Sequence, residues 1–179
     1  MRRSFGIGIL AIAGLSALVI SASSAAPPAR TLTGQMTQLQ YLVGTWHCTI
    51  AVSAQGKMAA HTDVGTLLFD VEPSNTVGYY ISSGPYAAGG FYGWVASKQL
   101  WYVSGADNFG GTSFETGSGS GGLMMMTGST TMQSRTMTTR DKYTKASATK
   151  IGDLSQYLKA GRWLTSYNST CTKTSNKSM

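Results

Sequence analysis

The chain holds few side chains that could carry acid–base or nucleophilic chemistry. Its carboxylates are Asp63, Asp70, Glu72, Asp107, Glu115, Asp141 and Asp153, and its histidines are His47 and His61. No two carboxylates have a local spacing that predicts acid–base work, and neither histidine lies in a Gly-x-Ser-x-Gly context that would activate a serine. We therefore predict no catalytic residue and no metal site, although folding could bring two carboxylates together in the interior.

Short runs rich in β-branched and aromatic residues fill the chain after residue 45 and are typical of β-strands. About ten such runs follow one another between turn residues, and the longest covers residues 131–147. The exception is the segment 34–42, where Met36, Leu39 and Leu42 have helical spacing. The segment 34–42 is therefore expected to form one or two helical turns before the first strand.

An antiparallel sheet of this size has two unpaired edges that invite aggregation, and closure into a barrel removes both. We therefore predict an all-β fold, a single antiparallel up-and-down β-barrel of about eight to ten strands with a short N-terminal helical turn. Trp46 follows that turn at the start of the first strand. Its large ring is predicted to plug the end of the barrel beneath the turn.

The first residues have the pattern of a secretory signal peptide. Two arginines give a positive head, residues 5–20 are apolar but short for a membrane span, and the segment up to Ala26 is small and polar. The alternative, an uncleaved anchor helix, is disfavoured because no positive stop follows. We predict a signal peptide at 1–26, a barrel domain at 27–179, and a secreted or periplasmic protein.

Cys48 and Cys171 are the only two cysteines. An even number in an exported chain favours a disulfide, and barrel closure brings the first and last strands together. We predict a bridge between the two; the alternative is a pair of unpaired structural thiols. In the chain-entropy model a bridge over so long a loop contributes roughly 4 to 5 kcal/mol to stability.

Charge argues against several partner classes. Charged residues make up 12% of the chain, with 14 basic and 7 acidic residues. Removing Arg2 and Arg3 with the signal peptide leaves 12 basic and 7 acidic residues, a net charge of +5. Because this charge is spread thinly, we expect no nucleic acid partner, and no membrane partner after signal cleavage. The sequence leaves the oligomeric state open.

The interior of the barrel is the predicted binding site. Aromatic rings supply flat apolar area and thioethers adapt their shape, so both suit an apolar guest. The candidate ligand-binding residues are Tyr92, Trp94, Trp101, Met124, Met126 and Met137. We predict an exported barrel that binds a small, largely apolar molecule. The alternatives are an enzyme acting on a small hydrophobic substrate in the same cavity, favoured by two inward ionisable groups within hydrogen-bond reach, and a filled-core structural or interaction module.

Four segments of the chain have a recognisable order: LVGTWHCT at 42–49, ADNFGG at 106–111, TRDKYTK at 139–145 and STCTK at 169–173. Together these segments resemble exported bacterial lipocalin-like barrels of the calycin type. The resemblance covers nearly the whole mature chain. It implies a barrel and a secreted location, and it supplies no established reaction or ligand.

A more distant similarity is to the nitrobindin-like haem barrels, which carry a Gly-x-Trp-x-Gly start and a late axial histidine. In this chain Cys48 stands in place of the second glycine, and both histidines lie in the first half. If Trp46 and Cys48 face inward, strand alternation turns His47 outward. We therefore predict no cofactor, and haem is disfavoured.

Overall fold

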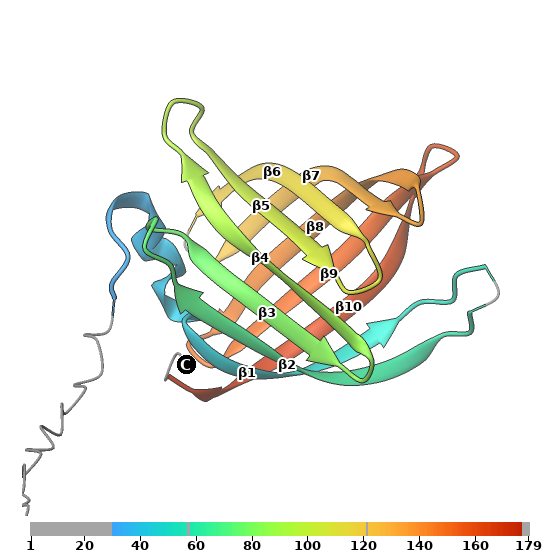
Figure 1. The fold of residues 1–179 in the computed structure, drawn as a ribbon, viewed down its shortest axis with the longest axis horizontal. Coiled ribbons are helices and arrows are strands. Elements are labelled where there is room, and N and C mark those ends of the chain that lie inside the picture. The colour runs from blue at the N-terminus through green and yellow to red at the C-terminus, as the bar shows by residue number, and fades with distance from the viewer. Residues whose placement is uncertain (1–29, 57, 121, 177–179) are drawn as a thin grey trace, which may run out of the picture.

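Ten antiparallel strands follow one another around the molecule, each hydrogen-bonded to the next in sequence (Figure 1). The computed structural model describes residues 30–56, 58–120 and 122–176. The predicted signal peptide at 1–26 lies outside these residues and stays a prediction. The strands are β1 (Gly44–Val52), β2 (His61–Val71), β3 (Val77–Ser83), β4 (Tyr86–Val95), β5 (Leu100–Asp107), β6 (Thr112–Ser120), β7 (Leu123–Met132), β8 (Arg135–Ser147), β9 (Lys150–Lys159) and β10 (Arg162–Ser175).

The first and last strands, β1 and β10, pair with each other and close the barrel. Cys48 lies directly opposite Cys171 in this pairing, and the two form a disulfide across 123 residues of sequence. The predicted all-β, antiparallel up-and-down barrel and its bridge are both confirmed. Because disulfides persist in oxidising surroundings, the bridge indicates a non-reducing compartment.

The segment 131–147, which was expected to form one strand, is broken by a tight turn at Gln133 and Ser134. These residues have positive φ angles of 47° and 65°, so the chain reverses direction between β7 and β8. Met132 therefore ends β7, whereas Met137 belongs to β8. Gly, Asn or Asp usually marks such a turn, and the sequence has none of them here.

A 3-10 helix, η1 (Gly34–Leu42), lies at one end of the barrel, at the left in Figure 1. Met36, Leu39 and Leu42 are buried, so the predicted helical turn forms with its apolar side inward. Trp46 is fully buried next to this helix, and its Nε1–H donates a 2.6 Å hydrogen bond to the carbonyl oxygen of Leu42. In the described part of the chain no helix has the length and apolar character needed to cross a membrane.

Lys173 on β10 ties η1 to the barrel. Its Nζ donates hydrogen bonds to the carbonyl oxygens of Tyr41 at 2.7 Å and Val43 at 2.8 Å. The same ammonium group lies 5.1 Å from the ring centroid of Trp46. The ammonium group of Lys173 therefore links the end of η1 to β10 and to the buried indole of Trp46. The β1–β2 hairpin projects at the opposite end (Figure 1).

Candidate functional site

The barrel encloses a cavity of about 530 Å³ that opens at the end opposite η1. Gln55, Met58 and His61 of the β1–β2 hairpin line its mouth. Apolar side chains form much of the wall and include Ile50, Leu67, Phe69, Ile81, Val103 and Ile151. A cavity of this volume is within the range that holds small-molecule ligands. The interior is therefore not filled by the side chains of the strands.

Three of the six predicted ligand-binding residues, Tyr92, Met124 and Met137, line this cavity. The ring of Tyr92 meets the ring of Tyr143 edge to face at 5.6 Å and that of Tyr79 at 5.5 Å. Both of these tyrosines also line the cavity. The wall around Tyr92 is consequently aromatic, with phenol groups at its edges.

The other three predicted residues, Trp94, Trp101 and Met126, do not line the cavity. Strand register places them in one row, since Trp94 faces Trp101, Trp101 faces Gly117 and Gly117 faces Met126. Gly117 adds no side chain to this row, and the two indole rings lie 5.0 Å apart. Trp101 and Met126 are 1% and 0% exposed. This row packs as core, and the next row towards the mouth, with Tyr92, borders the cavity.

Three carboxylates that no local spacing relates lie together in the interior. Glu115 on β6, Asp141 on β8 and Asp153 on β9 all line the cavity. Glu115 is 2% exposed and Asp141 is 9% exposed. Sequence reasoning missed this cluster because its members come from separate strands. Strand alternation was the available signal, since it puts Thr139, Asp141 and Tyr143 on one face of β8.

Each of these carboxyl groups has one oxygen that accepts a hydrogen bond from a hydroxyl group. The donors are Thr139 to Glu115 at 2.6 Å, Tyr143 to Asp141 at 3.2 Å and Tyr167 to Asp153 at 2.8 Å. The second oxygen of each group is buried and accepts no hydrogen bond from an N–H or hydroxyl group of the described residues. Glu115 and Asp141 also hydrogen-bond each other, which requires a proton on one of them. Because a buried acceptor without a donor is costly, the cluster gains from any group that brings further donors.

Burial raises the pKa of all three carboxyl groups. Burial, followed by the charge of Asp141, raises the pKa of Glu115 from 4.5 to about 7. Burial also raises the pKa of Asp141. Burial and the neighbouring charge of Asp141 raise the pKa of Asp153 well above its usual value. Below about pH 7 Glu115 is therefore largely protonated.

The tyrosines around the cluster are neutral phenols. Burial is the main cause that raises the pKa of Tyr79 to about 12 and the pKa of Tyr92, Tyr143 and Tyr167 well above 10.0. A neutral phenol can both donate and accept a hydrogen bond. The cavity therefore presents polar groups that can adapt to the polar part of a guest.

The lining of the cavity is acidic although the chain is basic. Five of the seven carboxylates of the chain line it, while none of the residues that line it in the described structure is a Lys or Arg. The five are Asp63, Asp107, Glu115, Asp141 and Asp153. The cationic side chains that give the chain its formal charge of +7 thus lie elsewhere.

Neither histidine supplies a buried ligand for haem iron. His47 is exposed on the outer face of β1, as strand alternation predicts. His61 is exposed at the mouth, where its Nε2 lies 3.4 Å from Asp63 Oδ2. Within residues 30–56, 58–120 and 122–176, no three His, Cys, Asp or Glu side chains lie in an arrangement that could hold a metal ion.

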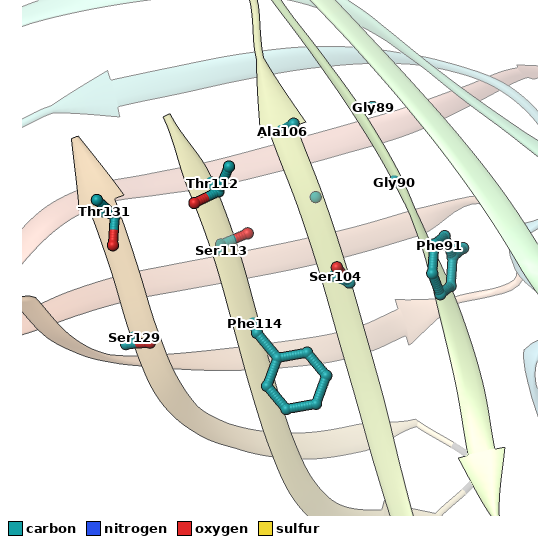
Figure 2. Close-up of a pocket in the computed structure, with 11 residues that line it drawn as sticks. Gly89, Gly90, Phe91, Ser104, Ala106, Thr112, Ser113, Phe114, Ser129 and Thr131 are labelled. Atoms are coloured by element: carbon teal, nitrogen blue, oxygen red, sulfur yellow. The ribbon is translucent and has the colours of Figure 1, made fainter. Parts of the chain in front are cut away.

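A second hollow, of about 500 Å³, lies on the outer face of β4 to β7 (Figure 2). Figure 2 shows the rings of Phe91 and Phe114 on either side of Ser104. Glycines and hydroxyl residues form most of its lining, and no ionisable residue is among them. It is open to solvent and has no charged group to orient a ligand.

The closed barrel also occurs in solved structures. The crystal structure of Rv2717c from M. tuberculosis matches with a TM-score of 0.63 over 80% of this chain and 99% of that chain, at 13% identity. The likeness establishes the barrel fold alone. A redesigned beta barrel matches at a TM-score of 0.38 and 14% identity, over 82% of this chain and all of that chain. No protein-family model matches the sequence, and no curated protein does.

The resemblance to lipocalin-like and nitrobindin-like barrels is thus supported as far as the ten-stranded antiparallel barrel. The comparisons do not show that the chain belongs to either group. The comparisons add no ligand or reaction.

Proposed function

We propose that this protein is an exported barrel, secreted or periplasmic, that binds one small, largely apolar molecule in its interior. The proposal rests on the cavity of about 530 Å³, which is open at one end and walled largely by apolar side chains. Apolar area removed from water supplies the binding free energy, at roughly 25 cal/mol per Å². The disulfide between Cys48 and Cys171 supports the export of the chain.

Nile red, a neutral apolar dye, tests this proposal when paired with two matched substitutions. Ala88 on β4 lines the cavity, whereas its neighbour Ala87 does not. Ala88→Trp places an indole in the cavity and is expected to weaken dye binding at least about tenfold. Ala87→Trp is expected to bind dye as the wild type does. If Ala88→Trp and Ala87→Trp bind the dye equally well and Phe114→Ala loses dye binding, the dye binds in the outer hollow and not in the barrel interior.

A second function, an enzyme acting on a small hydrophobic substrate in the same cavity, is favoured by the pair Glu115 and Asp141. Two carboxyl groups that hydrogen-bond each other, one with a pKa of about 7, can serve as general acid and general base. Native mass spectrometry of protein purified from its own host identifies a retained guest. A guest that wild-type protein converts, and that Glu115→Gln and Asp141→Asn do not convert, would establish the enzyme; an unchanged guest supports the binder.

A further inference from the structure

Three carboxyl oxygens in the cavity wall accept no hydrogen bond from an N–H or hydroxyl group of the described residues: Glu115 Oε2, Asp141 Oδ1 and Asp153 Oδ1. Glu115 and Asp141 hydrogen-bond each other, which requires a proton on one of the two carboxyl groups. The partner oxygens of the same groups are already bonded to hydroxyl groups of the chain. Glu115 and Asp141 are more than nine-tenths buried, so water reaches them poorly. A guest that brings N–H donors to these oxygens satisfies acceptors that the protein leaves open.

No Lys or Arg of the described residues lines the cavity around this cluster. The other titratable groups that line the cavity are the phenols of Tyr41, Tyr79, Tyr86, Tyr92, Tyr143, Tyr157 and Tyr167 and, towards the mouth, His61, Asp63 and Asp107. Strand β7 contributes Met124, Thr130 and Met132, none of which titrates. Negative charge inside walls of low polarity attracts cations strongly, because little solvent screens it.

An organic ammonium group fits this cluster better than a bare metal ion. No three acidic, histidine or cysteine side chains of the described structure are arranged to hold a metal. A primary ammonium has three N–H donors and can hydrogen-bond one or two of these carboxyl oxygens without all three converging on a single point. The rings of Tyr92 and Tyr143 stand beside the cluster, and aromatic faces attract ammonium ions.

We propose that the guest of the cavity carries a protonated amino group, which Glu115, Asp141 and Asp153 bind while the apolar wall holds the rest of the molecule. This inference rests on the proposed function, since it requires a guest in the cavity. It narrows the substrate class from apolar molecules in general to apolar amines.

Binding of an amine also displaces a proton. In the empty protein Glu115, with a pKa of about 7, is largely protonated in mildly acidic solution. An alkylammonium, whose pKa is about 10.4 as in lysine, arrives charged and favours the ionised carboxylate. The carboxyl proton then passes to the buffer, and no covalent bond to the guest forms or breaks.

Isothermal titration calorimetry with octylamine, 1-octanol and octanoate separates the two proposals. The three probes share one apolar chain and differ in the charge of the head group. We expect octylamine to bind at least about tenfold more tightly than 1-octanol, and octanoate to bind more weakly than either. Titrations at about pH 6 in buffers of different ionisation enthalpy should show proton release with octylamine and none with 1-octanol.

A matched pair of glutamate variants tests the assignment of the head-group site. Glu115→Gln keeps the shape of the buried side chain and removes its charge. We expect the ratio of octylamine to 1-octanol affinity to fall about tenfold and the proton release to shrink. Glu72, which is exposed and lies outside the cavity, provides the control: Glu72→Gln is expected to keep the wild-type ratio.

The outcomes distinguish the failure of each proposal. If 1-octanol binds as tightly as octylamine in the wild type, the amine inference is wrong and the apolar binder stands. If none of the three probes binds, both proposals fail. The proton release is measured on the wild type, so it decides the inference even if Glu115→Gln does not fold.

Discussion

Thr139 on β8 donates a 2.6 Å hydrogen bond to Glu115 on β6, across the intervening strand β7. Both residues face Gly128 in the strand register. Gly128 has no side chain, so the two polar groups meet over it, and a Cβ at this position would lie 2.0 Å from the carbonyl oxygen of Phe114. The glycine therefore permits the close approach of β6 and β7 at this point.

Loss of the Thr139 hydroxyl should raise the pKa of Glu115 further, because this hydrogen bond favours the charged carboxylate. Thr139→Val is expected to raise that pKa by about 1, as a hydrogen bond to a charged group is worth roughly 1.5 kcal/mol or more. Carboxyl-carbon NMR titration measures the change. Thr138→Val, on the exposed face of the same strand, is the control and should leave the titration as it is. An unchanged or lower pKa in Thr139→Val would show that the hydroxyl does not stabilise the carboxylate.

The free energy of unfolding should fall as the pH rises from 4.5 to about 7, because Glu115 titrates at 4.5 when unfolded and at about 7 when folded. Between these values the folded protein binds more protons than the unfolded chain, so the stabilisation is fully present below pH 4.5 and lost through pH 7. The decrease from Glu115 is at most about 3 kcal/mol. Urea denaturation across this range measures it.

Glu115→Gln should make that pH dependence shallower without abolishing it, since the pKa values of Asp141 and Asp153 are also raised by burial. Glu72→Gln should keep the wild-type slope. A wild-type stability that stays flat or increases over the same range would contradict the raised pKa of Glu115.

Reduction of the disulfide should lower the melting temperature appreciably. The bridge spans 123 residues, and in the chain-entropy model so long a loop corresponds to about 4 to 5 kcal/mol of stability. Differential scanning calorimetry with and without reductant, and of Cys171→Ser, should show the same loss. An unchanged melting temperature in both experiments would mean that the bridge does not stabilise the closed barrel.

Trp46→Phe should destabilise the closed end of the barrel. The substitution removes the 2.6 Å hydrogen bond to Leu42 and leaves that carbonyl oxygen without the indole donor. The expected cost is about 2 kcal/mol in urea denaturation. Trp163 provides the control: it is half-buried, and its ring centroid lies 4.3 Å from the guanidinium carbon of Arg140. Trp163→Phe should lower the free energy of unfolding by less than about 1 kcal/mol. Equal effects of the two substitutions would contradict a special role for Trp46.

The strands could be predicted because their signals are local: runs of β-branched and aromatic residues define them. Closure was predicted from the unpaired edges of an antiparallel sheet and from two cysteines near its first and last strands, which the structure pairs. The turn at Gln133 and Ser134 was missed since neither residue type marks positive φ. In that case packing of the neighbouring strands overrides the local preference.

The binding residues were predicted only in part because alternation fixes the face of a residue and not its position along the barrel axis. Trp101 and Met126 do face inward, but they belong to a packed row beside Gly117. The neighbouring row, with Glu115 and Thr139, borders the cavity instead. Apolar composition selected the core residues, and it gave no reason to look for buried carboxylates.

Methionine-methyl NMR in the presence of 1-octanol tests most directly whether the barrel interior binds an apolar guest. Met124 lines the cavity, and so does Met137, whereas Met125 points outward and is 43% exposed. We predict nuclear Overhauser contacts from the octanol chain to the methyl groups of Met124 and Met137 and none to Met125. Contacts to Met125 alone, or to no methionine at saturating octanol, would contradict an internal binding site.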